Sequence, residues 1–201
     1  MPWRVAFEEA WSSAAAGNYG IGAVLIDPSS QSVVATGRNR VTDNAPPVGQ
    51  VGGNFLAHAE INALAAMPSS SARGFHLYST LEPCLMCSAT AIQLNVEHVH
   101  FAASDEFFGD LDDLWTHHQY TRTRRPGRTG PLDGMLARFA RLLPLAFTLR
   151  TLPDSTAARV ARTREPELAS LADRLAPGGD LDDVWLAARV DDAIDQLGPL
   201  L

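Results

Sequence analysis

Two short segments decide the predicted fold of this chain of 201 residues: Ala57-His58-Ala59-Glu60 and Glu82-Pro83-Cys84-Leu85-Met86-Cys87. Cys84 and Cys87 are three residues apart, so both thiols fall on one face of a helix's first turn, and Pro83 suits the start of that helix. The partial positive charge at a helix N-terminus favours the thiolate form that binds metals. By itself, such a pair is equally compatible with a redox pair or with two inert core thiols.

His58 supplies the third potential metal ligand. One histidine and two cysteines leave one position of a tetrahedral zinc ion open, which is typical of catalytic rather than structural sites. A water molecule in that position becomes hydroxide near neutral pH. Glu60 is placed to accept the proton of this water without binding the metal itself. We therefore predict one Zn²⁺ per chain, bound by His58, Cys84 and Cys87, with Glu60 as the catalytic residue.

The rest of the sequence alternates between strand and helix patterns. Strands are predicted over Ile21–Ile26, Val33–Thr36, Phe75–Thr80 and Val96–Ala103. Helices are predicted over residues 2–16, between His58 and Pro68, and over 83–95. Residues 41–57 form a loop long enough to suggest a function. Later, a helix is predicted over residues 132–143 and one more strand over Leu145–Leu152. This order predicts a layered α/β domain with right-handed crossovers.

Composition excludes several classes of protein. The net charge of −7 and the pI of about 5.3 argue against a general nucleic-acid binder. All 16 basic residues are arginine, which excludes a lysine nucleophile or Schiff base. The two cysteines lie too close together to form a disulfide framework. With no signal pattern and no run of about 20 apolar residues, we expect a cytoplasmic protein without a membrane partner.

The combination H-x-E with P-C-x-x-C is the signature of zinc nucleobase deaminases. The chain resembles the cytidine-deaminase-like superfamily, especially the branch of tRNA adenosine, guanine and cytosine deaminases. The resemblance rests on Gly37–Arg40, Ala57–Leu64 and Leu77–Cys87, and it extends over the middle half of the chain. It implies a three-layer α/β/α sandwich with a mixed central sheet and the zinc at the N-termini of two adjacent helices.

The resemblance also implies roles for residues around the zinc. An activated water would attack the amine-bearing ring carbon, and Glu60 would pass protons to the ring nitrogen and to the departing ammonia. The backbone N–H of Ala59 would hold the incoming oxygen or a carbonyl of the base. Asn39 matches the asparagine that contacts the base in the family. Alternatively, Asn39 only ends a strand and bonds its own backbone.

Further candidate substrate contacts follow the same motifs. Ser79 and Glu82 lie beside the cysteines, although Glu82 could instead cap the helix. In the segment 105–115, Phe107 and Phe108 could stack on a flat ring, and Asp105 could accept hydrogen bonds from it. Alternatively, this segment is the start of a helix packed into the core.

Departures from the family pattern narrow the substrate. The small three-cysteine cytidine deaminases have cysteine at the position of His58, and a riboflavin-pathway deaminase would need a second domain. A tRNA adenosine deaminase usually has a basic surface, whereas residues 151–201 carry ten acids and five arginines. The arginine cluster at 122–128 is the one contrary feature, and we interpret it as a solvated loop. His76, His98 and His100 are expected to be structural.

These observations predict a hydrolytic zinc deaminase for a small aminated heterocycle, such as a nucleobase or nucleoside, that acts as a homodimer and without a nucleic-acid partner. The alternatives are a tRNA or single-stranded nucleic-acid deaminase and a non-catalytic zinc-binding subunit. We divide the chain into a deaminase domain, residues 1–152, and an acidic helical extension, residues 153–201. Amphipathic helices in that extension must pack on the core or on a partner chain.

Overall fold

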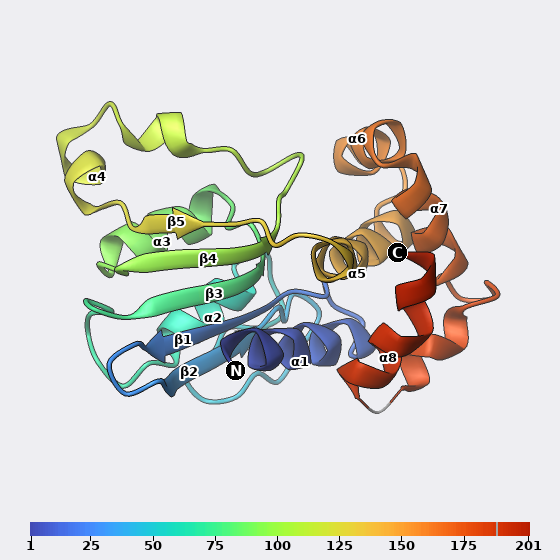
Figure 1. Cartoon of the computed structure of the whole chain (residues 1–201), viewed down its shortest axis with the longest axis horizontal. Coiled ribbons are helices and arrows are strands. Elements are labelled where there is room, and N and C mark those ends of the chain that lie inside the picture. Colours follow the sequence, from blue (N-terminus) through green and yellow to red (C-terminus); the bar gives the residue numbers. More distant parts are fainter. Residues whose placement is uncertain (188) are drawn as a thin grey trace.

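A five-stranded mixed sheet forms the centre of the molecule (Figure 1). The computed structural model describes residues 1–187 and 189–201. The strands lie in the order β2-β1-β3-β4-β5. Their bounds are β1 Gly22–Asp27, β2 Ser32–Arg38, β3 His76–Leu81, β4 His98–Ala103 and β5 Gly127–Thr129. β1 runs antiparallel to β2 and β3, whereas β3, β4 and β5 are parallel, so the predicted hairpin and mixed sheet are confirmed.

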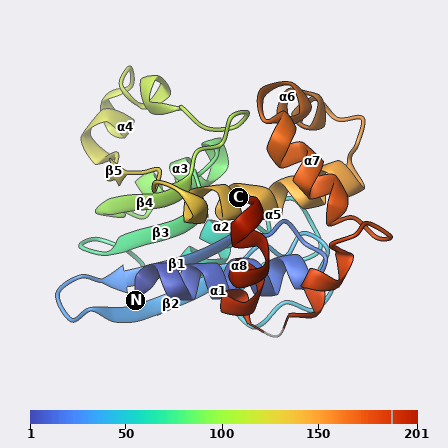
Figure 2. The same ribbon diagram turned by 45° about the vertical axis from the view of Figure 1, so that its right-hand side comes forward.

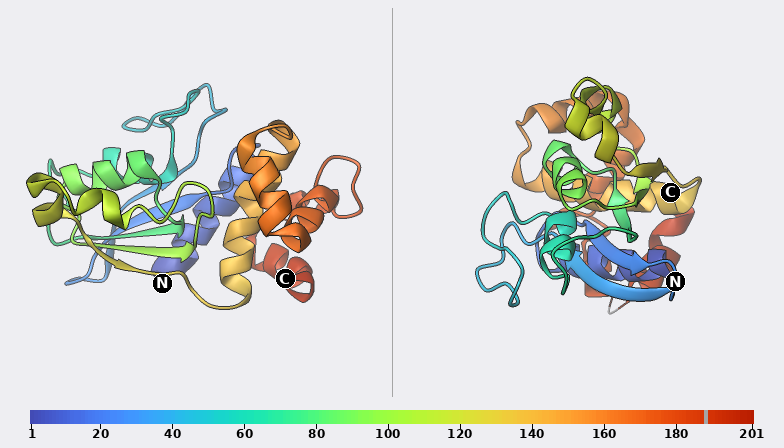
Figure 3. Two further views of the ribbon diagram at one scale, coloured as in Figure 1. Left: turned by 90° about the horizontal axis from the view of Figure 1, so that it is seen from above. Right: turned by 90° about the vertical axis from the view of Figure 1, so that its left-hand side faces the viewer.

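Helices cover both faces of this sheet, as expected for the three-layer sandwich (Figure 3). Helix α1 (Pro2–Ala15) lies on one face, and α2 (Ala59–Ala65) and α3 (Leu85–Gln93) lie on the other. Side chains alternate along a strand. In β1, Val24 and Ile26 therefore pack against α1, while Ala23 and Leu25 pack against the α2 side.

The C-terminal third forms a group of helices beside α1 and the strand ends (Figures 1 and 2). It contains α5 (Met135–Thr151), α6 (Thr156–Arg164), α7 (Pro166–Arg174) and α8 (Val190–Leu197). One hydrophobic cluster joins these helices to α1, and Trp185 stacks on Trp11 with ring centroids 5.3 Å apart. The tail thus shares a core with the preceding residues, while the domain division at residue 152 stays a prediction.

Shorter elements complete the described chain. They are η1 (Asp112–Trp115), α4 (Gln119–Arg124), η2 (Asp182–Leu186) and η3 (Gly198–Leu200). Among the helices that the structure describes, none combines the length and apolar character that a bilayer crossing requires.

The strand predicted over Leu145–Leu152 is wrong, because α5 continues through this segment to Thr151. The apolar residues of 145–152 follow a pattern that is also compatible with a strand. In the structure, α5 packs against both α1 and α7 and is buried on more than one side. Burial of this kind removes the single apolar stripe that identifies a surface helix. The fifth strand is instead the short β5, within the arginine-rich segment.

Candidate active site and metal centre

The predicted metal ligands come together at the starts of two adjacent helices. His58 and Cys84 are the N-cap residues of α2 and α3, and Cys87 lies in the first turn of α3. Nδ1 of His58 lies 3.6 Å from Sγ of Cys84 and 3.4 Å from Sγ of Cys87. The three ligand atoms all lie within 4.8 Å of one another. One imidazole and two thiols this close fit the donor set that holds zinc with a fourth position open.

The charges of these groups favour a cation. A hydrogen bond from Cys87 and the neighbouring His58 lower the pKa of the Cys84 thiol to about 4, against the opposing effect of burial. The same contact with Cys84, together with burial, raises the pKa of Cys87 well above its usual range. A metal ion bound by both sulfur atoms would require Cys87 as well as Cys84 to be deprotonated.

Glu60 lies behind the ligands and is almost fully buried. Its Oε1 accepts a hydrogen bond from Oγ of Ser79 at 3.0 Å, and its Oε2 accepts one from Sγ of Cys87 at 3.3 Å. Burial raises the pKa of Glu60 above its ordinary value, although the charge of His58 works in the opposite direction. A carboxyl group with a raised pKa can both accept and return a proton more easily near neutral pH. The buried hydroxyl of Ser79 thus fixes the position of the Glu60 carboxylate.

A cavity of about 570 Å³ opens beside the metal ligands. This volume lies within the range of about 300–1,000 Å³ that is usual for small-molecule sites. His58, Glu60 and Cys84 line one side. The other side comes from α5 and the start of α6, through Arg141, Pro144, Leu145, Thr148, Leu152, Ser155, Thr156 and Ala157. Sequence reasoning did not find this wall, because amphipathic spacing shows that a helix is buried but not what it covers.

Asn39 borders the same cavity directly after β2. Its Oδ1 accepts a hydrogen bond from the backbone N–H of Val41 at 3.1 Å, and its backbone oxygen accepts one from Oγ of Ser13 at 2.7 Å. Within the described chain, no group accepts a hydrogen bond from its Nδ2. The alternative in which Asn39 bonds the backbone at the end of its strand therefore holds for Oδ1. A contact between Nδ2 and the substrate stays a prediction.

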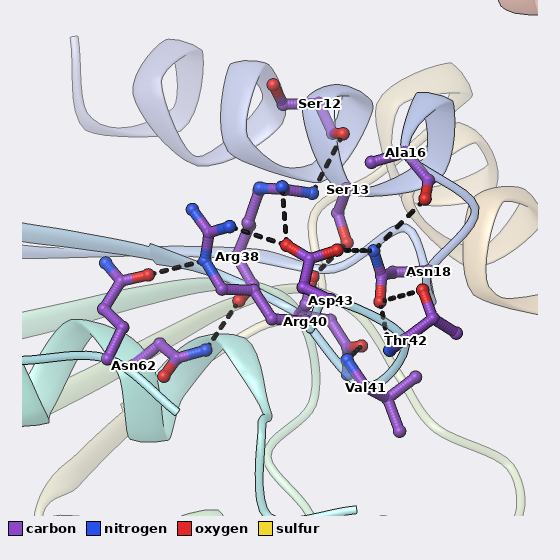
Figure 4. A network of polar contacts seen from close by, with 12 residues as sticks. Ser12, Ser13, Ala16, Asn18, Arg38, Arg40, Val41, Thr42, Asp43 and Asn62 are labelled. Carbon is purple, nitrogen blue, oxygen red and sulfur yellow. Dashed lines mark hydrogen bonds and ion pairs between the residues drawn. The ribbon is translucent and has the colours of Figure 1, made fainter. Parts of the chain in front are cut away.

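A polar network fixes the chain after Asn39 (Figure 4). The carboxylate of Asp43 accepts hydrogen bonds from Arg38 at 2.8 Å, Arg40 at 2.7 Å and Asn18 at 2.8 Å. Burial opposes the charge of Asp43, but these donors outweigh it and lower its pKa. Asn62 of α2 binds the backbone of Val51 through both its oxygen and its nitrogen. The loop 41–57 is thus tied to the helix that begins at His58.

Glu82 is a buried anchor of the segment that follows β4. It accepts hydrogen bonds from the backbone N–H groups of Asp105 and Asp110, at 3.3 and 3.1 Å. It also forms an ion pair of 2.5 Å with Arg128 of β5. Both oxygens of Glu82 are therefore engaged by the protein, although Glu82 lines the cavity and its predicted substrate contact stays untested. The contact between Arg128 and Glu82 could not be predicted, because nothing in the sequence of the arginine cluster distinguishes Arg128 from its exposed neighbours.

The aromatic candidates lie in the segment that Glu82 holds. Oδ1 of Asp105 accepts hydrogen bonds from the N–H groups of Phe107 and Phe108, both at 3.0 Å. The two rings meet edge to face with centroids 4.5 Å apart, and both line the cavity while remaining partly exposed. Ala59, by contrast, is fully buried as the first residue of α2 and is not among the cavity-lining residues. The role of its N–H group stays a prediction.

Comparison with known families agrees with this geometry. Residues 3–103, half of the chain, match the family described as "Cytidine and deoxycytidylate deaminase zinc-binding region". The chain belongs to this family. The zinc-binding region that this family shares corresponds here to the cluster of His58, Cys84 and Cys87. Zn²⁺ is therefore the cofactor that His58, Cys84 and Cys87 fit.

Individual relatives and solved structures match part of the chain or share its fold. The chain is 28% identical over 96 residues to the tRNA-specific adenosine deaminase of Rickettsia felis, over 46% of this chain and 61% of that protein. A structure from a study of A-to-I editing by tRNA:A34 deaminases matches 63% of this chain and 94% of its own, at 27% identity and a TM-score of 0.52. The guanine deaminase of Nitrosomonas europaea shares the fold, at 23% identity and a TM-score of 0.52 over 71% of this chain and 80% of its own. The chain thus spans less than two thirds of the length of the Rickettsia relative.

Proposed function

We propose that this deaminase hydrolyses the exocyclic amine of a small, unphosphorylated heterocycle, either a nucleobase or a nucleoside. The observation that carries the proposal is the charge of the cavity. Three carboxyl groups line it, from Glu60, Glu82 and Asp105, and of these Glu82 is paired with Arg128, which lies outside the lining. Arg141 is the one arginine among its described lining residues, and its guanidinium binds the carboxylate of Glu165 through contacts of 2.7, 3.0 and 3.2 Å. A phosphate would therefore meet acidic groups without a free cation to neutralise it.

The chemistry follows from the position of Glu60. Zinc, when bound, supplies a water nucleophile that is activated at neutral pH. Glu60 would accept a proton from water and deliver it to the ring nitrogen beside the amine-bearing carbon. It would then carry the second proton to the amine, so that water and the C–NH₂ group become a carbonyl and ammonia. Ser79 keeps the carboxylate in line through its hydrogen bond of 3.0 Å.

The aromatic side chains at the cavity supply the remaining recognition. Phe55, Phe107 and Phe108 offer apolar faces and edges against which a flat ring can pack. The cavity also extends beyond the metal ligands to Leu152 and Thr156, so a sugar or a similar neutral substituent has room next to the base.

The test is ammonia release by the zinc-loaded protein from nucleobases, nucleosides and their 5′-monophosphates. We expect kcat/KM for a nucleoside to exceed that for its monophosphate by at least about tenfold, which corresponds to about 1.4 kcal/mol. Glu165→Gln should narrow this difference by releasing Arg141. Glu167→Gln is the matched control, because Glu167 is exposed and lies 3.8 Å from Arg138. Equal or faster turnover of the monophosphate by the unaltered protein would contradict the proposal.

A second candidate is deamination of adenosine in tRNA, which the Rickettsia relative and the tRNA:A34 deaminase structure favour. The exposed arginines of α4 are not among the described residues that line the cavity. Arg122 and Arg124 belong to α4, which contacts the C-terminal end of α3 through Tyr120 and Gln93, whereas Cys84 lies at the opposite end of α3. Inosine formation in a tRNA transcript, together with no turnover of free nucleosides, would establish this alternative.

We also propose that the deaminase forms a homodimer through the face beside its active site. Phe55, Leu56 and Leu85 are each more than half exposed on this face, which is unusual for large apolar side chains placed close together. Light scattering should give twice the mass of the chain for the unaltered protein and a lower mass for Leu85→Glu. A monomeric unaltered protein would contradict this proposal.

A further inference from the structure

Three histidines lie together on the sheet, away from the zinc ligands. His76 is the first residue of β3, and His98 and His100 are the first and third residues of β4. In the parallel register, His76 is directly opposite His98. Because side chains alternate along each strand, all three imidazoles stand on the same face of the sheet. His76 begins β3, whereas Cys84 follows the other end of this strand, and six residues of strand are about 16 Å long.

The three rings form a close triangle. The ring centroids are 5.4 Å apart for His76 and His98, 5.3 Å for His76 and His100, and 4.4 Å for His98 and His100. None of the three side chains is fully buried, so ions from solvent can reach them. Figure 1 shows α1 in front of the region of β1, and α5 beyond the right-hand ends of β3 and β4. The reaction at the zinc centre uses none of these histidines.

Two of the imidazoles are already separated like ligands of one metal ion. Nε2 of His100 lies 3.3 Å from Nδ1 of His76. Two nitrogen ligands of a tetrahedral zinc ion, each at 2.0–2.1 Å, are about 3.3 Å apart. Tyr78 holds His100 in this place by stacking on it with centroids 4.2 Å apart, and Trp3 packs edge-on against Tyr78.

As the side chains lie, the ring nitrogens of the three histidines do not all come within 4.8 Å of one another, so His98 would have to turn its side chain to join the other two. Its Nε2 now contacts Oγ1 of Thr129 at 2.8 Å, a neutral hydrogen bond that a metal bond would replace. Burial and the neighbouring imidazoles lower the pKa of His100 to about 4, and the pKa of His98 is lowered for the same reasons. Both rings are therefore neutral at pH 7, which is the form that binds metals.

We propose that His76, His98 and His100 form a second cation site, for a divalent transition-metal ion of the zinc, nickel and copper class. Imidazole is a favoured ligand of these ions. Two ligands at alternate positions of one strand and a third on the adjacent strand hold a metal at the surface of the sheet. Such a site leaves further coordination positions to water and can take up or release its ion without disturbing the catalytic zinc.

The test measures metal stoichiometry of the zinc-loaded protein after equilibrium dialysis against Zn²⁺, and separately against Ni²⁺. We expect two metal ions per chain in the unaltered protein and one in His100→Phe, which keeps an aromatic ring on Tyr78. His76→Asn and His98→Asn should also bind one. The remaining zinc at His58 and the cysteines shows that each variant is folded.

His117→Asn is the matched control, since His117 is exposed and lies outside the cluster, and it should retain both metal ions. A copper spectrum should show nitrogen ligation that disappears in His100→Phe. The proposal is overturned if the unaltered protein binds a single metal ion, or if the second ion persists in His100→Phe.

Discussion

Replacement of Arg128 by methionine tests whether the ion pair with Glu82 holds the cavity wall. The side chain of Glu82 is 9% exposed and that of Arg128 is 18% exposed, so water screens this pair only weakly. The loss of a hydrogen bond to a charged partner costs about 1.5–3 kcal/mol. Glu82 would keep its bonds to the N–H groups of Asp105 and Asp110, so we expect a loss of about 2 kcal/mol rather than a larger one.

Urea denaturation measures this change directly. For a chain of this length, about 2 kcal/mol corresponds to a fall in Tm of about 4–8 °C. Arg125→Met is the control, because Arg125 is exposed and should change stability by no more than about 0.5 kcal/mol. Without the ion pair, Glu82 should hold the segment 105–110 less firmly. KM should then rise, because Phe107 and Phe108 of this segment line the cavity. If Arg128→Met is as stable as the control, or if its effect adds independently to that of Glu82→Gln, the pair does not act as described.

Three further predictions concern other parts of the structure. Glu60→Gln should keep zinc and lose turnover, whereas Cys87→Ala should lose both, as zinc analysis and ammonia release will show; a Cys87→Ala protein with full zinc would contradict the ligand set. Asp43→Ala removes the acceptor shared by Arg38, Arg40 and Asn18, so we expect a loss of stability of about 3 kcal/mol in urea denaturation and a raised KM, and an unchanged protein would refute the role of this network. The unfolded chain binds a proton at His100 near pH 6.5, but the folded chain binds it only near pH 4, so stability should fall between these values as the pH is lowered. In His100→Phe, stability should depend less on pH over this range. If the variant and the unaltered protein lose stability identically as the pH is lowered, His100 is not responsible for the dependence.

The zinc centre could be predicted from the sequence because its signal is local. His58 and Glu60 are two residues apart, Cys84 and Cys87 are three apart, and each pair begins a helix. The spacing within a helix turn fixes which side chains share a face, so the chemistry follows from short stretches of chain. The same locality explains why the four principal strands and the first three helices were predicted near their observed bounds.

The cavity wall could not be predicted because it depends on contacts between distant segments. Nothing near Thr148 or Leu152 indicates that α5 lies opposite residues some ninety positions earlier in the chain. The same holds for Arg128, which differs from the exposed Arg125 through its contacts with Glu82, Asp112 and Phe101, all of them distant in the sequence from an arginine-rich segment that looks uniform. The apolar run at 145–152 fits both a strand and a buried helix, and only packing against α1 and α7 decides between them.

Glu60 and a zinc ion together are proposed to release ammonia from a small heterocycle in this cavity. Ammonia release from a panel of nucleobases and nucleosides should be compared between the zinc-loaded protein and Glu60→Gln with the same zinc content. We expect turnover of at least one ring type by the unaltered protein and none above background by the variant. Equal ammonia release by both proteins, or none from any small substrate by the unaltered protein, would contradict this proposal.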